Sequence, residues 1–188
     1  MPKIISLYGL PAAGKTTQAD LLVKEYGFIQ FGMGDRLRAE IESGSELGQK
    51  IKVYVDAGTL ISDELMLEVI KTVGNEMKEK GIVFDGFPRI LSQAEMLKDL
   101  TGELGMDTDA FICLNISPEE ALRRIEARCA ISGRADDKDA SAVKNRLDVF
   151  RKESTALMDY YRSQGKLIEI DGEKSIEEVY AEIKKHLG

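Results

Sequence analysis

Residues 9–16 read Gly9-Leu10-Pro11-Ala12-Ala13-Gly14-Lys15-Thr16, and Thr17 follows directly. This run fits the pattern G-x-x-x-x-G-K-[ST], in which glycines allow backbone N–H groups to approach a phosphate closely. The apolar residues 4–8 before the run suit a buried strand, and residues 18–25 after it suit a helix. The order of strand, loop and helix predicts a phosphate-binding loop. The alternative is a plain strand–turn–helix corner.

Two kinds of side chain in this loop are expected to bind nucleotide directly. The ammonium of Lys15 would contact the β- and γ-phosphates, and the hydroxyl of Thr16 or Thr17 would bind Mg²⁺. The N-terminus of the following helix adds free N–H groups and a partial positive charge. Mg²⁺ is therefore the expected cofactor.

The composition limits the possible classes of protein. The chain has 188 residues, of which 43% are apolar, and this size suits a single domain. Its formal net charge of −7 argues against a protein held to nucleic acid mainly by phosphate contacts. No apolar run reaches the length of about 18 residues that a membrane span needs. Two cysteines, Cys113 and Cys129, are too few for a four-thiolate zinc site, and we expect a reducing cytoplasmic location and a monomer.

Strand-like and helix-like segments alternate along the chain, which predicts an α/β fold. The expected architecture is a five-stranded parallel sheet with helices on both faces. Its strands are expected at residues 4–8, 28–31, 82–84, 111–116 and 167–170. Two short helices are expected at residues 35–43 and 46–57. A longer helix should begin after the capping residue Ser62 and run to about Glu79.

Asp85-Gly86-Phe87-Pro88-Arg89 follows the third strand, at the edge where open parallel sheets bind ligands. Asp85 is placed to organise Mg²⁺ through water, and the alternative is a structural turn aspartate. Pro88 restricts the turn, so that Arg89 can clamp a phosphate with two hydrogen bonds.

A second group of cations lies between residues 123 and 146. Seven basic residues stand there against four acidic ones, which leaves three net positive charges: Arg123, Arg124, Arg128, Arg134, Lys138, Lys144 and Arg146. A solvated helix face explains Arg123, Lys138 and Lys144. Phosphoryl transfer explains the remainder, because it needs several fixed cations around a group whose charge spreads in the transition state.

Four motifs occur together in this chain. They are the phosphate loop continuing into Gln18, Gly34-Asp35-x-x-Arg38, Asp85-Gly86-Phe87-Pro88-Arg89 with Gln93 four residues on, and Ser132-Gly133-Arg134-x-Asp136-Asp137. In this order and approximate spacing they resemble the signature set of the adenylate kinase family, over essentially the whole chain. The resemblance implies an enzyme that transfers a phosphoryl group from MgATP to AMP and forms two ADP.

The resemblance also implies how the single domain of residues 1–188 is divided. A phosphate-loop NTPase core would comprise residues 1–31, 62–128 and 138–188. Residues 32–61 would form a helical lobe that binds the nucleoside monophosphate (NMP). Residues 129–137 would form a short lid without a zinc site.

Site residues follow from the resemblance by position. Those implied for ATP are Gly9, Pro11, Ala12, Ala13, Gly14, Lys15, Thr16, Thr17, Arg124 and Arg128. Those implied for AMP are Met33, Arg38, Gly58, Leu60, Ile61, Gly86, Arg89, Gln93, Arg134 and Arg146. The residues implied in catalysis are Lys15, Arg89, Arg124, Arg128, Arg134 and Arg146. Asp136 and Asp137 would orient the arginines and brace the lid.

The chain departs from the family pattern at a few positions. Leu10, Ala12 and Thr16 stand where the family usually has glycine, and alanine tolerates positive φ poorly. Met33 replaces a hydroxyl residue that would contact the acceptor nucleotide. Gln93 favours adenine, because its amide offers both a donor and an acceptor. Two alternatives stay open: a kinase for UMP, CMP or another acceptor, and a nucleotide sensor that binds without turnover.

Overall fold

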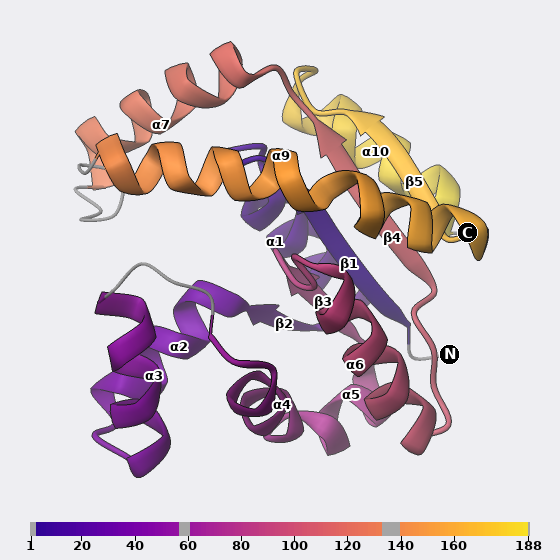
Figure 1. Cartoon of the computed structure of the whole chain (residues 1–188). Coiled ribbons are helices and arrows are strands. Elements are labelled where there is room, and N and C mark those ends of the chain that lie inside the picture. The colour runs from indigo at the N-terminus through magenta and orange to yellow at the C-terminus, as the bar shows by residue number, and fades with distance from the viewer. Residues whose placement is uncertain (1–2, 57–60, 133–139, 188) are drawn as a thin grey trace.

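The computed structural model describes residues 3–56, 61–132 and 140–187. Its centre is a five-stranded sheet in which every pair is parallel, with the strand order β2-β3-β1-β4-β5 (Figure 1). The strands are β1 (Ile4–Gly9), β2 (Ile29–Gly32), β3 (Ile82–Asp85), β4 (Ala110–Asn115) and β5 (Leu167–Asp171). The predicted parallel α/β architecture is confirmed, with strand positions within about two residues of those expected.

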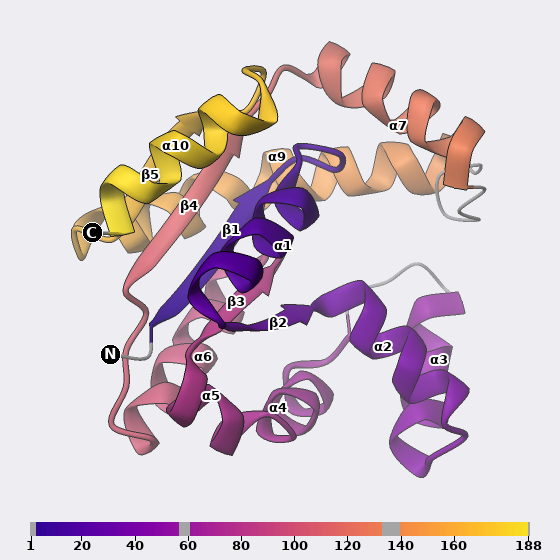
Figure 2. The same ribbon diagram turned by 180° about the vertical axis from the view of Figure 1, so that it is seen from behind.

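Helices connect successive strands and cover both faces of the sheet (Figures 1 and 2). They are α1 (Lys15–Tyr26), α2 (Met33–Glu42), α3 (Glu46–Asp56), α4 (Asp63–Lys71), α5 (Gly74–Lys80), α6 (Leu91–Glu103), α7 (Pro118–Ser132), α9 (Ala140–Ser163) and α10 (Ile176–Leu187). None of the helices in the described ranges is long and apolar enough to cross a membrane.

The alternation of side chains along β1 divides the core into two layers. Ile5 and Leu7 are fully buried on the face that α1 and α10 cover. Ile4 and Tyr8 point to the opposite face, where Ile4 meets the core beneath α4 to α6 and Tyr8 meets α9. Because both faces are buried, β1 has no solvent-facing polar side, and its sequence is largely apolar apart from the buried Ser6.

One predicted helix, residues 62–79, is wrong as a single element. Ser62 caps it as expected, because its hydroxyl accepts a hydrogen bond from the Leu65 N–H. The helix then ends at Lys71, where the Thr72 hydroxyl donates to the Val69 carbonyl and weakens the regular ladder. A new helix, α5, starts at Gly74. The break lets the side chains of both helices enter the same buried cluster.

Two groups of helices project beyond the carboxyl edge of the sheet, α2 with α3, and α7 with the N-terminal part of α9, whose remainder crosses the sheet (Figure 1). In the first pair the backbones touch, because a Cβ at Gly48 would lie only 2.1 Å from the carbonyl oxygen of Glu40. In the second pair, Cys129 to Ser132 belong to the last turn of α7, so the start of the expected lid is helical. Residues 133–137 of that lid lie outside the described residues.

Candidate active site

The phosphate loop joins β1 to α1 and has the conformation that its motif requires. Gly9 and Gly14 have positive φ values of 143° and 94°. A Cβ at Gly9 would lie 2.6 Å from the carbonyl oxygen of Leu114, so any larger residue would displace β4. Gly14 is the N-cap of α1 and supplies no side chain to it, so backbone N–H groups of the first turn face the loop.

Ala12 has a φ of 63°, which is the left-handed conformation that disfavours alanine. Among the described residues it is the one non-glycine with positive φ. Its methyl group lies against the small cluster formed by Leu10 and residues of α7 and α9. The loop therefore adopts the same kind of backbone turn that glycine would allow, at a torsional cost of roughly 1–2 kcal/mol.

Lys15 is the first residue of α1, three residues before the helix start expected from the sequence. Its Nζ donates to the carbonyl oxygens of Gly9 and Leu10, at 3.0 and 2.8 Å. Burial lowers the pKa of Lys15 to about 8, Asp85 opposes this shift, and Arg89 and Arg128 add to it. The ammonium is thus held inside the loop in a place that disfavours an uncompensated positive charge.

Thr16, rather than Thr17, is joined to Asp85. The Thr16 hydroxyl donates to Asp85 Oδ2 at 2.6 Å, which brings together two oxygen atoms, one from the first turn of α1 and one from the carboxyl end of β3. Neighbouring hydroxyl and carboxylate oxygens suit Mg²⁺, which prefers oxygen ligands and keeps several waters. Thr17 is exposed on α1.

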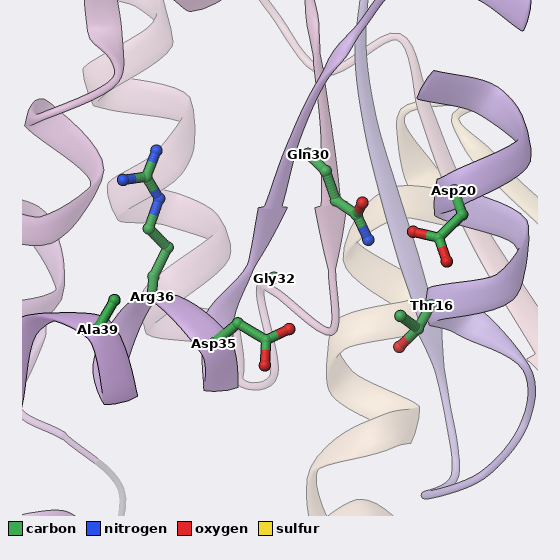
Figure 3. A pocket seen from close by; sticks show the side chains of 7 residues that line it. All are labelled: Thr16, Asp20, Gln30, Gly32, Asp35, Arg36 and Ala39. Carbon is green, nitrogen blue, oxygen red and sulfur yellow. The ribbon is translucent and has the colours of Figure 1, made fainter. Parts of the chain in front are cut away.

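A hollow of about 330 Å³ opens beside Thr16, between α1, β2 and α2 (Figure 3). Its lining residues are Thr16, Asp20, Gln30, Gly32, Asp35, Arg36 and Ala39. Figure 3 shows the carboxylates of Asp20 and Asp35 directed toward this space and the Arg36 guanidinium turned away from it. The hollow separates the phosphate loop from the start of the expected NMP lobe.

The chain turns sharply after β3, and Gly86 in this turn lies next to the Lys15 side chain. Gly86 has a φ of 76°, and its N–H donates to the Leu7 carbonyl at 3.0 Å. Its oxygen accepts a hydrogen bond from Arg89 Nε at 2.9 Å. The buried Gln93 braces the turn, because its Oε1 accepts from the backbone N–H of Arg89 at 2.8 Å. Both contacts restrict the direction in which Arg89 can point.

Cations from four elements converge at this edge of the sheet. Loss of hydration lowers the pKa of Arg89, Asp85 opposes the shift, and the nearby charge of Arg146 on α9 adds to it. Arg128 on α7 has a similar effect on Lys15. Arg124 is held differently, because its Nε donates to Glu120 Oε1 at 2.6 Å. Such a group of like charges is suited to bind a polyanion such as a nucleotide phosphate chain.

Comparisons with known proteins agree with this geometry. A family model described as adenylate kinase matches residues 7–166. The chain belongs to the adenylate kinase family.

Relatives named adenylate kinase match nearly the full chain. That of Parabacteroides distasonis is 39% identical over 182 residues, covering 96% of this chain and 95% of the relative. That of Bacteroides fragilis is 41% identical over 182 residues, covering 96% of each. That of Phenylobacterium zucineum is 44% identical over 178 residues, covering 94% of this chain and 93% of the relative.

The residues expected from the adenylate kinase family do not all lie together. Lys15, Thr16 and Arg89 surround Asp85 and Gly86 at the carboxyl edge. Arg38 lies on α2 and pairs with Asp35. Met33 and Ile61 are buried in the core cluster beneath α4 to α6. The expected residues Gly58, Leu60, Arg134, Asp136 and Asp137 lie outside the described residues.

The side-chain partners of Glu120 and Ser117, at the start of α7, differ from those that the sequence pattern suggests. Ser117-Pro118-Glu119-Glu120 has the sequence pattern of a capping box, and the Ser117 hydroxyl does accept from the Glu120 N–H at 3.3 Å. The Glu120 carboxylate instead binds Arg123 and Arg124, and Glu173 accepts from the Ser117 N–H at 2.8 Å. The spacing of four between Glu120 and Arg124 was the available signal.

Replacing Ala12 with glycine should stabilise the protein by about 0.5–1 kcal/mol, because glycine adopts φ of 63° without steric strain. Urea unfolding monitored by circular dichroism measures the change. Ala13→Gly is the matched control. Ala13 is 2% exposed, and its φ is not positive. Removal of its buried methyl group should therefore lower the free energy of unfolding by about 1 kcal/mol. Equal effects of the two variants would contradict strain at Ala12.

The lowered pKa of Lys15 predicts opposite pH trends for stability and for ATP binding. Between about pH 8 and pH 10.5 the unfolded chain binds the Lys15 proton more strongly than the folded chain, so the stability of the nucleotide-free protein should rise. Affinity for ATP should fall over the same range, by up to about tenfold per pH unit, because the neutral amine no longer attracts phosphate.

Calorimetric titration and urea unfolding at pH 7 to 10 test this pair of trends. Lys15→Met should abolish both trends, because the titrating group is removed. Identical pH dependence in the wild type and this variant would assign the effect to another group.

Proposed function

We propose that this member of the adenylate kinase family transfers the terminal phosphoryl group of MgATP to AMP, reversibly, and forms two ADP. The observation that carries the proposal is the convergence of two cations on Gly86. A Cβ at Gly86 would lie 3.6 Å from Lys15 Cε and 3.7 Å from a terminal nitrogen of Arg89. One cation comes from the phosphate loop and the other from a separate turn, as two phosphate chains meeting end to end would require.

The reaction would proceed by direct in-line transfer between the two nucleotides. Lys15 would bind the β- and γ-phosphates of the donor, and Arg89 would hold the phosphate of the acceptor. Arg128 and Arg146 would neutralise the charge that spreads over the transferred group, together with Arg134. Because no nucleophile of the protein is needed, positioning and electrostatic stabilisation supply the catalysis.

Mg²⁺ would be held near the phosphate loop by the Thr16 hydroxyl and by Asp85, directly or through water. The chemistry that the ion would supply there is neutralisation of part of the charge of the donor phosphates. Thr16 and Asp85 would orient the bound water molecules. Their mutual hydrogen bond of 2.6 Å supports this assignment.

The acceptor base would be adenine, bound between the turn after β3 and the lobe of residues 32–61. Gln93 would present its amide nitrogen to the base, and its oxygen, which already accepts from Arg89, has a second lone pair. Met33, Gly58, Leu60 and Ile61 would form the apolar wall of this pocket. Arg38, which pairs with Asp35, would release this carboxylate and bind the acceptor phosphate instead.

The lobe of residues 32–61 and the lid of residues 129–137 would close over the nucleotides. Closure would exclude water, which otherwise competes with AMP for the phosphoryl group.

We further propose that the protein is a cytoplasmic monomer. Both cysteines are free, and the exposed large apolar side chains Tyr26, Val53, Leu122 and Ile176 belong to four different helices.

Rates of ADP formation from ATP with AMP, dAMP, UMP and CMP would test the proposal directly. We expect AMP to be preferred over UMP and CMP by at least about tenfold, because the amide of Gln93 can pair with the donor and acceptor of the adenine edge and the pocket would be shaped for the larger purine. A preference for UMP or CMP would point to the other kinase class. Tight nucleotide binding without any product would point to a sensor.

Arg89→Ala should lower kcat/KM for AMP by at least about a hundredfold and leave the fold intact. The reason is that it removes a charged phosphate contact, whereas the side chain contributes no core packing. Arg162→Ala is the matched control, since Arg162 is exposed and pairs with Asp159 and Glu169. Near-normal turnover by Arg89→Ala would remove Arg89 from the site.

A further inference from the structure

Tyr8 is an aromatic residue inside the sheet, next to the phosphate loop. It lies on β1 immediately before Gly9 and is 4% exposed. Its ring packs between Phe111 of β4 and Phe150 of α9, with centroid distances of 5.2 and 5.1 Å. Figure 1 shows α9 crossing this part of the sheet. The ring therefore belongs to the core, while its hydroxyl lies at the carboxyl edge.

The hydroxyl of Tyr8 has no hydrogen-bond partner among the described residues. A buried hydroxyl without a partner is unfavourable, and phenylalanine would fill the same space without that cost. The Tyr161 hydroxyl is also buried without a partner among the described residues, so what singles out Tyr8 is its place directly before the phosphate loop, where a partner can be acquired in another state of the protein.

Charged groups on two different elements act on the Tyr8 hydroxyl electrostatically and could complete its hydrogen bonds after a side-chain movement. Burial raises the pKa of Tyr8, as do Cys113 and Glu153, whereas the charge of Arg89 opposes the shift. Glu153 follows Phe150 by three residues on α9, so both lie on one helix face. Arg89 is tied to Gly86, whose N–H bonds to Leu7, the neighbour of Tyr8 in β1. The phenol stays protonated at neutral pH and can both donate and accept.

We propose that Tyr8 is a positioning residue: in the nucleotide-bound enzyme its hydroxyl accepts a hydrogen bond from Arg89 and donates one to Glu153. The proposal rests on the proposed function, because it concerns the arginine that would hold the acceptor phosphate. The contact would connect the turn after β3 to α9, the helix that also carries Arg146. It would also bring a carboxylate into the network, which offsets the repulsion between Arg89 and Arg146.

Tyr8→Phe tests the hydroxyl alone. We expect kcat/KM for AMP to fall about tenfold, because a hydrogen bond to a charged group is lost. The dissociation constant of ATP alone should stay within about twofold of wild type, because Arg89 does not contact the donor. Thermal unfolding of the nucleotide-free variant should occur at the same or a higher temperature, because an unpartnered buried hydroxyl is removed.

Tyr161→Phe is the matched control within the same row of rings. Tyr161 stacks on the other side of Phe111 at 4.1 Å, is 2% exposed, and lies toward the opposite end of the sheet beside Thr108. This variant should have wild-type kinetics.

A double variant supplies the second test. In an Arg89→Lys background, Tyr8→Phe should have little further effect on kcat/KM for AMP, because Tyr8 acts through Arg89.

Three results would overturn the proposal. The first is full activity of Tyr8→Phe. The second is a loss of thermal stability that parallels its loss of activity, which would show that the hydroxyl maintains the resting fold. The third is full additivity with Arg89→Lys. Wild-type ADP formation from ATP and AMP is measured alongside, so failure of the proposed reaction is distinguished from failure of the role of Tyr8.

Discussion

The close approach of the loop backbone to β4 is the constraint on which the site depends. At Gly9 the main chain passes so near the Leu114 carbonyl that no side chain fits between them. Positive φ at Gly9, Ala12 and Gly14 then bends the chain back so that α1 begins at Lys15. The backbone N–H groups, the Lys15 ammonium and the positive end of the helix dipole are thereby directed to one point.

A second constraint is electrostatic. Burial is the main reason that the pKa values of Lys15 and Arg89 are lowered, and the neighbouring charges of Arg128 and Arg146 lower them further. Asp85 opposes both shifts without cancelling the cost of burial, and Lys15 donates hydrogen bonds to carbonyl oxygens of its own loop. The site therefore stores unfavourable charge that an anionic ligand would relieve, and the same charge discriminates against cationic or neutral ligands.

The sequence allowed the fold and the centre of the site to be predicted, because both depend on local patterns. The phosphate loop and the turn from Asp85 to Arg89 follow buried strands, and parallel strands bring their carboxyl ends together. The break between α4 and α5 was not predictable in this way, since Thr72 competes with the helix only through one side-chain hydrogen bond. The position of Tyr8 beside α9 was not predictable either, because it depends on contacts between residues more than a hundred positions apart.

The contact at Gly48 has a consequence for how the first pair of projecting helices can move. Since the backbones of α2 and α3 already touch there, the two helices cannot slide or bend against each other without a collision. The two helices are therefore expected to keep their mutual arrangement as one body. That body is joined to β2 at Gly32 without an intervening loop and is also anchored to the core, because Met33 of α2 and Ile51 of α3 are buried in the cluster beneath α4 to α6.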